Sequence, residues 1–283
     1  KFLTRGYESS VDGQIHFGLG KAFKVDSVTV IWPDDKIQVL HNIGLDTAIT
    51  LDYLNARTRR LTVSGRKQML FKEVAIEKGI DYQQWENSFI DFNVQPLLPY
   101  MHSKLGPKLA VGDIDGDGLE DFYVGGAHGF SGQFFLRREN GSFFFNILDL
   151  DVEKEDMDAL LFDADGDGDL DLYVVSGGSE FKKDSPSYQD RLYVNDGNGN
   201  FKLSEKALPI ITSSGSVVRA GDYDGDGDLD LFVGGRIVPG EYPLPPRSYI
   251  LNNNNGIFTD VTAVVCPSLQ NAGMVTSALW TDY

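Results

Sequence analysis

Cysteine and histidine are scarce in this 283-residue sequence. Cys266 is the only cysteine, so no disulfide can form within the chain and a disulfide-stapled scaffold is excluded. The four histidines, His16, His41, His102 and His128, are scattered, so no zinc cluster of His and Cys is indicated. We interpret them as packing or surface residues, with His128 as the one candidate for a binding role.

Long apolar runs and enzyme motifs are also missing. No stretch of 18 or more apolar residues and no signal-peptide pattern occurs, and the chain begins at Lys1. We therefore expect a soluble fragment of a longer protein, with no membrane insertion in this part. The sequence contains no Gly-x-Ser-x-Gly elbow, no His-Glu-x-x-His and no Walker loop, so we expect no catalytic residues and no enzyme activity.

Positive charge is in short supply. The 25 Lys and Arg stand against 42 Asp and Glu, which gives a formal net charge of −17. A polyanion such as DNA would be repelled over most of this surface, so nucleic acid is excluded as a partner. Much of the acid lies in three tight clusters, which favours cation binding. The 31 Gly, 18 Phe and 12 Tyr are typical of a turn-rich β-protein with little helix.

Three copies of one pattern follow one another: GDIDGDGLEDFYVGGA, DADGDGDLDLYVVSGG and GDYDGDGDLDLFVGGR. Their acid runs begin at Asp113, Asp163 and Asp222, a period of about 50 to 60 residues, and Asp282 lies where a fourth copy would open. Each copy continues to an Asn-Gly pair between apolar runs, which indicates a tight hairpin. One repeat therefore predicts a four-stranded meander of the length of a propeller blade, and such blades bury their faces against each other.

The sequence thus predicts an all-β fold in three parts. Residues 1–56 form a small β-domain, because they hold three β-branched or alternating runs at 25–32, 37–40 and 48–53. Residues 57–70 are rich in Lys and Arg and form a linker. Residues 71–283 form a partial β-propeller with three complete acid loops and a truncated fourth.

Each acid loop has the pattern Asp-x-Asp-Gly-Asp-Gly-x-x-Asp. The alternate carboxylates let one curled loop aim several oxygens inward, the glycines permit positive φ, and the seventh residue can add its carbonyl oxygen. Oxygen ligands on a flexible loop suit Ca²⁺ better than Zn²⁺ or Mg²⁺. We therefore expect three structural Ca²⁺ ions, each clamping a hairpin, and a fourth site opening at Asp282. The predicted ligands are Asp113, Asp115, Asp117, Leu119 and Asp121; Asp163, Asp165, Asp167, Asp169 and Asp171; and Asp222, Asp224, Asp226, Asp228 and Asp230.

These loops, followed by Val-Gly-Gly-Ala or Val-Gly-Gly-Arg, resemble the FG-GAP repeats, also called VCBS repeats, of integrin α-subunit propellers and many secreted bacterial proteins. The segment from Arg5–Ser10 through His16–Gly20 to Val28–Pro33 resembles the ASPIC and UnbV module, which accompanies such repeats in the cartilage acidic protein family. The resemblance implies a seven-bladed, Ca²⁺-binding propeller that serves as a binding platform outside the cytoplasm. It also implies a blade-closing strand at Phe71–Val74.

A partner surface is predicted on the face opposite the acid loops. Blade geometry sends the loops at 127–133, 177–190 and 236–247 to that face, and long uneven loops of repeat proteins often bind ligands. The alternative is that these are ordinary surface loops that bind no partner. The candidate partner residues are His128, Phe181, Tyr188, Arg236, Tyr242 and Arg247.

The function expected from these features is that of a secreted, periplasmic or cell-surface module that binds a protein or a polysaccharide. One alternative is a non-catalytic accessory domain of a larger secreted enzyme that acts on carbohydrate or lipid. A second alternative is a glycan-binding lectin.

Overall fold

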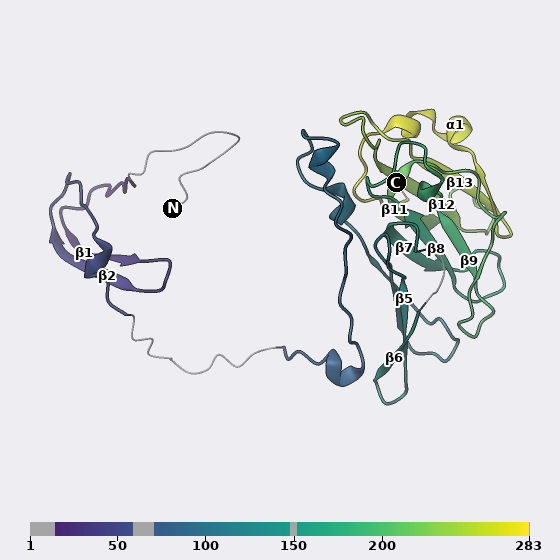
Figure 1. The fold of residues 1–283 in the computed structure, drawn as a ribbon, viewed down its shortest axis with the longest axis horizontal. Coiled ribbons are helices and arrows are strands. Elements are labelled where there is room, and N and C mark those ends of the chain that lie inside the picture. The colour runs from purple at the N-terminus through teal and green to yellow at the C-terminus, as the bar shows by residue number, and fades with distance from the viewer. Residues whose placement is uncertain (1–14, 59–70, 148–151, 283) are drawn as a thin grey trace. The chain divides into compact units, whose positions relative to one another are not determined.

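The computed structural model describes residues 15–58, 71–147 and 152–282. The chain divides into two compact units, Lys1–Lys72 and Glu73–Tyr283, which are drawn in Figure 1. Most of the predicted linker, residues 59–70, lies outside the described residues, as do the first 14 residues of the predicted N-terminal domain. Each unit is considered by itself.

The first unit is built on one hairpin, because two β-branched runs flank a tight turn. Strands β1 (Val25–Ile31) and β2 (Ile37–Ile43) pair antiparallel. The predicted strand at 48–53 is wrong, since the described chain has no strand there and η1 (Tyr53–Asn55) begins instead. The local reason is Asp52, whose carboxylate accepts the Leu54 N–H at 2.9 Å and caps this 3₁₀ turn.

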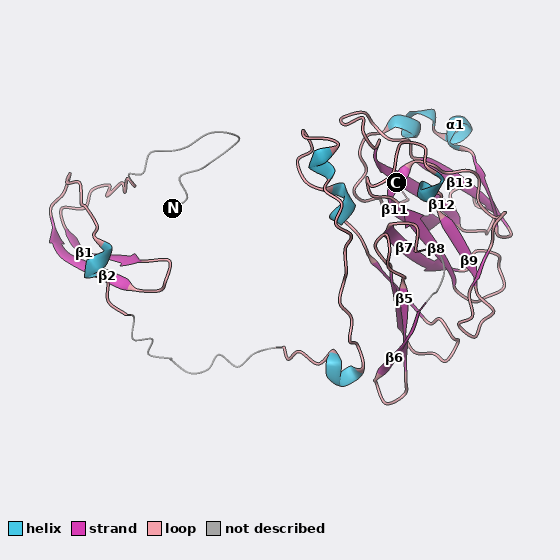
Figure 2. Ribbon diagram, viewed as in Figure 1, coloured by secondary structure: helices cyan, strands magenta, loops and turns pink. Residues whose placement is uncertain are grey.

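The described residues of the second unit form three four-stranded antiparallel sheets, whose strands lie in sequential order. Figure 2 shows these strands in magenta. We name the sheets blades 1, 2 and 3. Blade 1 consists of β3 (Leu109–Gly112), β4 (Asp121–Val124), β5 (Gln133–Arg137) and β6 (Phe143–Ile147). Blade 2 consists of β7 (Asp156–Phe162), β8 (Asp171–Ser176), β9 (Arg191–Val194) and β10 (Lys202–Leu203). Blade 3 consists of β11 (Ser214–Gly221), β12 (Asp230–Ile237), β13 (Tyr249–Asn254) and β14 (Ile257–Asp260).

These sheets confirm the prediction of an all-β fold with propeller-like blades. In each blade the acid loop joins the first two strands and the Gly turn joins the last two. The first strands of the blades are neighbours, with β7 in contact with both β3 and β11. The chain therefore stacks its meanders side by side, as the repeat pattern requires.

The blades are held together by two apolar cores, because successive residues of a strand point to opposite faces of its sheet. From β8, Leu172 and Val174 pack toward blade 1, whereas Tyr173 and Val175 pack toward blade 3. All four are fully buried. Burying one such side chain contributes about 1.5–3 kcal/mol. Blade 2 buries such side chains on both faces, so packing stabilises it more than blades 1 and 3.

The segment before blade 1 has no strand among its described residues, 71–108. It contains the short 3₁₀ turns η2 (Ile76–Lys78), η3 (Asp91–Asn93) and η4 (His102–Lys104). The blade-closing strand predicted at Phe71–Val74 is therefore wrong. Its Phe71 side chain is 89% exposed, so no neighbouring strand covers it.

After blade 3 the chain turns through α1 (Thr262–Val265) and η6 (Pro267–Asn271) and returns along the sheet. The Val275 N–H donates to Gly235 O at 2.9 Å, and Trp280 Nε1 donates to Arg219 O at 3.0 Å. Residues 275–280, which lead to the predicted fourth acid loop at Asp282, thus lie against blade 3.

Candidate metal centres

The first aspartate of each acid loop organises the turn. Its carboxylate accepts the N–H groups of the two loop glycines, at 2.9 and 2.8 Å for Asp113 and at 2.7 and 3.1 Å for Asp163. Asp222 does the same at 2.7 and 3.2 Å. All six glycines have positive φ, from 73° to 100°, a conformation that costs other residues energy. The Gly spacing of the sequence therefore produces one loop shape three times.

The ninth-place aspartates, Asp121, Asp171 and Asp230, open the second strand of each blade and are fully buried. Each accepts the N–H of the second loop residue, and each also accepts an N–H at the end of the third strand. For Asp171 these donors are Ala164 and Asn195, both at 2.9 Å. This carboxylate therefore ties the loop to the third strand, a role that the sequence pattern did not reveal.

Three carboxylates converge in every loop, from the first, third and ninth places. Their oxygens lie within 4.8 Å of one another in the groups Asp113, Asp115, Asp121; Asp163, Asp165, Asp171; and Asp222, Asp224, Asp230. In the first two groups the third-place Oδ1 atom, on Asp115 and Asp165, is buried without a hydrogen-bond partner. Buried carboxylate oxygens normally have partners, so this geometry fits a cation that would supply the missing contact.

The electrostatics of the second loop agree with that fit. Burial, reinforced by repulsion from Asp167, raises the pKa of Asp165. Burial raises the pKa of Asp171 to about 6, and burial with repulsion from neighbouring aspartates raises the pKa of Asp169 to about 6. The negative charge of the loop is therefore disfavoured without a counterion, and a divalent cation would relieve it.

The remaining predicted ligands do not join these groups. The fifth-place carboxylates turn back and accept the N–H of the seventh residue, as Asp117 does from Leu119 at 2.8 Å. In the same way, Asp167 accepts the Asp169 N–H at 3.1 Å and Asp226 accepts the Asp228 N–H at 3.0 Å. Ligation by these fifth and seventh places stays a prediction. Asp282 also stays one, because its loop would follow the last described residue.

The third loop has an amide that the sequence analysis missed. Asn252 Nδ2 donates to Asp224 Oδ2 at 2.9 Å and to Asp230 Oδ1 at 3.2 Å, so a neutral side chain lies against two members of that group. Asp222 and Asp224 are exposed, in contrast to the half-buried aspartates of the first two loops. The third site is therefore the most open to solvent.

Comparison with known families agrees with this architecture. Residues 2–58 match the model of the ASPIC and UnbV family, and residues 163–233 match the model of an FG-GAP-like repeat. The two matches lie in the predicted order, with the ASPIC and UnbV match before the FG-GAP-like repeat. The repeat match runs from the acid loop of blade 2 into β12 of blade 3. No curated protein matches the chain. Among the described residues, no helix is long and apolar enough to cross a membrane.

The predicted partner face of the FG-GAP-like blades is partly covered by the chain itself. Tyr188 is fully buried and its hydroxyl donates to Phe181 O at 2.9 Å. Arg236 is 7% exposed, and its guanidinium donates to the Tyr100 hydroxyl and to Met274 O. These two residues pack the unit and are not available to a partner, which corrects the prediction for them.

The other four candidates are half-buried. The rings of His128 and Phe181 meet edge to face, with centroids 5.0 Å apart. The Tyr242 N–H donates to the Gln95 side chain at 2.9 Å, and Arg247 pairs with Asp260 at 2.5 Å. Each keeps part of its surface exposed, so these four remain candidates for binding.

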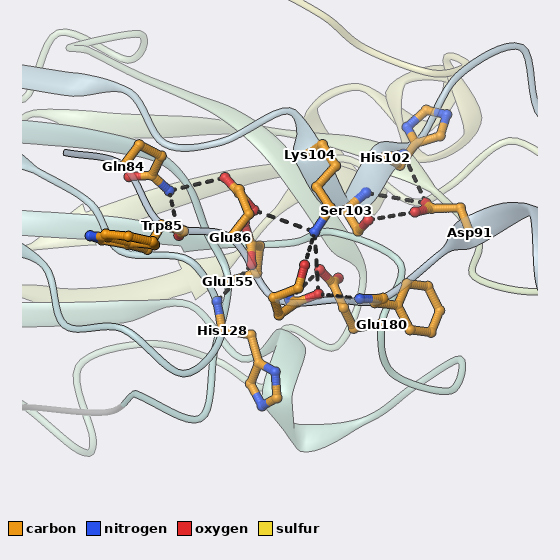
Figure 3. Close-up of polar contacts among 12 residues, drawn as sticks. Gln84, Trp85, Glu86, Asp91, His102, Ser103, Lys104, His128, Glu155 and Glu180 are labelled. Carbon is orange, nitrogen blue, oxygen red and sulfur yellow. Dashed lines mark hydrogen bonds and ion pairs between the residues drawn. The ribbon is translucent and has the colours of Figure 1, made fainter.

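The cover is formed by residues 84–104, whose polar contacts are drawn in Figure 3. Asp91 is its anchor. The Asp91 carboxylate is 1% exposed and accepts the N–H groups of His102 and Ser103, at 2.8 and 3.1 Å, and the hydroxyls of Ser103 and Ser179. Its pKa is lowered, since these four hydrogen bonds outweigh the opposing effect of burial. Asp91 thus fixes the segment to blade 2.

A second buried acid, Glu155, lies beside this cover (Figure 3). Its side chain is fully buried, Oε2 accepts the His128 N–H at 2.7 Å, and Oε1 has no hydrogen-bond partner. Burial, with repulsion from Glu180 and Glu86, raises the pKa of Glu155 to about 9. The folded protein therefore holds Glu155 as a neutral acid at pH 7.

Proposed function

We propose that each of the three acid loops binds one Ca²⁺ and that these ions hold the blades together. The observation that carries the proposal is the threefold recurrence of the same three converging carboxylates. An oxygen-only site on a flexible loop suits Ca²⁺, because Mg²⁺ demands a tight octahedron and Zn²⁺ favours nitrogen and sulfur ligands. No His or Cys belongs to these groups.

Bound calcium would remove a large electrostatic cost. Two carboxylate charges within 4.8 Å of each other repel by at least about 3 kcal/mol at an effective dielectric constant near 20, and each loop holds three such pairs. Three divalent ions would also offset roughly a third of the net charge of −17. The role proposed for the ions is structural, since the ninth carboxylate already ties each loop to the strands of its blade.

We further propose that the protein acts outside the cytoplasm as a non-catalytic binding module. FG-GAP-like repeats and the ASPIC and UnbV module support an extracellular or periplasmic setting. A protein or glycan partner would use the partly exposed residues His128, Phe181, Tyr242 and Arg247, which combine aromatic rings with positive charge. Glycan-array binding that is lost in Tyr242→Ala or Phe181→Ala would support a polysaccharide partner, and a blank array would exclude the sugars tested.

The calcium proposal is tested by thermal unfolding with and without chelator. At millimolar Ca²⁺ and a dissociation constant near 10⁻⁴ M, each site contributes about 1 kcal/mol, so EDTA should lower the melting temperature by roughly 6–12 °C. Asp165→Ala should remove about a third of that shift. The control is Asp81→Ala, because Asp81 is an exposed aspartate of the same unit outside the loops. Equal melting curves with calcium and with EDTA would refute the proposal.

A further inference from the structure

Two buried asparagines connect the acid loops of blades 2 and 3 with the acid loop of the blade before each. Asn253 belongs to β13, and Asn195 directly follows β9, so both lie where the third strand of a blade ends. They are 1% and 5% exposed. Their side chains contact two loops at once, which no motif of the sequence indicates.

Asn253 makes this connection between blades 2 and 3. Its Nδ2 donates to Leu229 O of its own loop at 3.1 Å and to Ala164 O of the preceding loop at 2.8 Å. Its backbone N–H donates to Asp230 Oδ1 at 2.8 Å, and its Oδ1 accepts the Gly256 N–H at 2.9 Å. Both amide hydrogens and the amide oxygen are therefore used, and the side chain has one orientation.

Asn195 repeats the arrangement between blades 1 and 2. Its Nδ2 donates to Leu170 O at 3.1 Å in its own loop and to Ile114 O at 2.9 Å in the preceding loop. Blade 1 has Arg137 at the corresponding place, where the N–H donates to Asp121 Oδ1 at 2.6 Å while the side chain is exposed. The described residues that lead into blade 1, 71–108, contain no acid loop whose carbonyl an amide at this place could bridge.

The Gly turns of blades 2 and 3 add a second contact between the loops. A Cβ atom at Gly256 would lie 2.9 Å from Asp165 Cβ, and one at Gly199 would lie 3.6 Å from Asp115 Cβ. The turn after the asparagine thus packs against the third-place aspartate of the preceding loop. Between blades 2 and 3, Asp163, Asp228 and Asn253 line one cleft of about 180 Å³.

We propose that Asn195 and Asn253 couple the occupancy of adjacent metal loops, so that the three sites fill cooperatively. The inference rests on the calcium sites of the proposed function. The carbonyl groups of Ile114 and Ala164 belong to the peptide units that carry Asp115 and Asp165, the aspartates with an unpartnered buried oxygen. Closing one loop round its ion fixes the asparagine, and the asparagine then holds the third-place ligand of the preceding loop in position.

Terbium emission can report metal binding at the third loop separately from binding at the other two. Trp280 stacks on Tyr223, the second residue of that loop, with ring centroids 6.3 Å apart. Tb³⁺ occupies calcium sites and emits when a nearby tryptophan is excited, so emission that disappears in Trp280→Phe reports binding at the third loop. Asp165→Ala disables the second loop but keeps the Cβ that faces Gly256.

The experiment compares Tb³⁺ affinity at the third loop with and without Asp165→Ala, in the native and the Asn253→Ala backgrounds. With Asn253 present, Asp165→Ala should weaken binding at least about fivefold, the lower end of typical coupling between sites. In the Asn253→Ala background the change should be less than about twofold. Asn252→Ala is the matched control, because the Asn252 side chain donates to two aspartates of its own loop, so its loss should preserve the coupling.

Two results would overturn the coupling while leaving the calcium sites standing: an equal shift in both backgrounds, or no shift while Tb³⁺ still binds. Absence of Tb³⁺ and Ca²⁺ binding at every loop would instead refute the proposed function together with the coupling. Native mass spectrometry of the unmutated protein at limiting calcium gives a test that needs no variant. Coupled sites predict fewer partly loaded species than independent sites do, and a distribution of independent sites would contradict the proposal.

Discussion

Replacing Glu155 with glutamine is expected to stabilise the second unit, Glu73–Tyr283, above pH 5. Burial keeps this carboxyl protonated in the folded protein, with a pKa of about 9 instead of the ordinary 4.5. Between these two pH values the folded state retains a proton that the unfolded state has lost. Stability therefore falls as pH rises from about 4.5 to about 9, and it levels off above the folded pKa.

The size of the effect follows from the two pKa values. Each pH unit in this window costs about 1.4 kcal/mol, so at pH 7 the native Glu155 destabilises the fold by about 3 kcal/mol relative to pH 4.5. Glutamine has the same shape, carries no charge, and keeps an oxygen to accept the His128 N–H. The variant should therefore lack this contribution at every pH.

Urea unfolding at pH 5, 7 and 8.5 in saturating calcium measures the difference. The gain in unfolding free energy of Glu155→Gln over the unmutated protein should grow across this series by several kcal/mol. Glu205→Gln is the control, because Glu205 is an exposed glutamate of the same blade. A gain that is independent of pH would show that Glu155 is ionised in the folded state and would refute the reasoning.

Two other variants test the contacts between segments. Arg191 and Asp156 form a buried ion pair at 2.5 Å, so Arg191→Ala leaves the Asp156 charge buried without its cation. We expect the free energy of unfolding in urea to fall by about 3–5 kcal/mol. A fall below about 1 kcal/mol would contradict the pairing. Asp91→Ala removes the anchor of residues 84–104, so limited trypsin digestion should cut at Lys104 at least tenfold faster while blades 2 and 3 stay intact. Unchanged cleavage at Lys104 would mean that Asp91 does not hold the cover.

The blades and acid loops can be predicted from the sequence because their determinants are local. Glycines that need positive φ, such as Gly166 and Gly168, lie beside the aspartates that accept their N–H groups, and the pattern recurs three times. The roles of single carboxylates could not be predicted. Asp117 turns back to the Leu119 N–H, whereas Asp115 faces the other acids, although both occupy alternate places of one motif.

The covered partner face could not be predicted because its contacts join distant parts of the chain. Asp91 and Ser179 are 88 positions apart, and Gln95 and Tyr242 are 147 positions apart. Neither pair belongs to a repeat or a periodic pattern, so nothing in the sequence indicates that they meet. The asparagine bridges could not be predicted for the same reason, since Asn195 lies 81 positions from Ile114.

The number of calcium ions bound per chain tests the central claim most directly. After equilibration in millimolar calcium and removal of free metal, elemental analysis and calorimetric titration should both give three Ca²⁺ per chain, and Asp165→Ala should lower the number to two. A folded protein that holds less than one Ca²⁺ per chain would contradict the account.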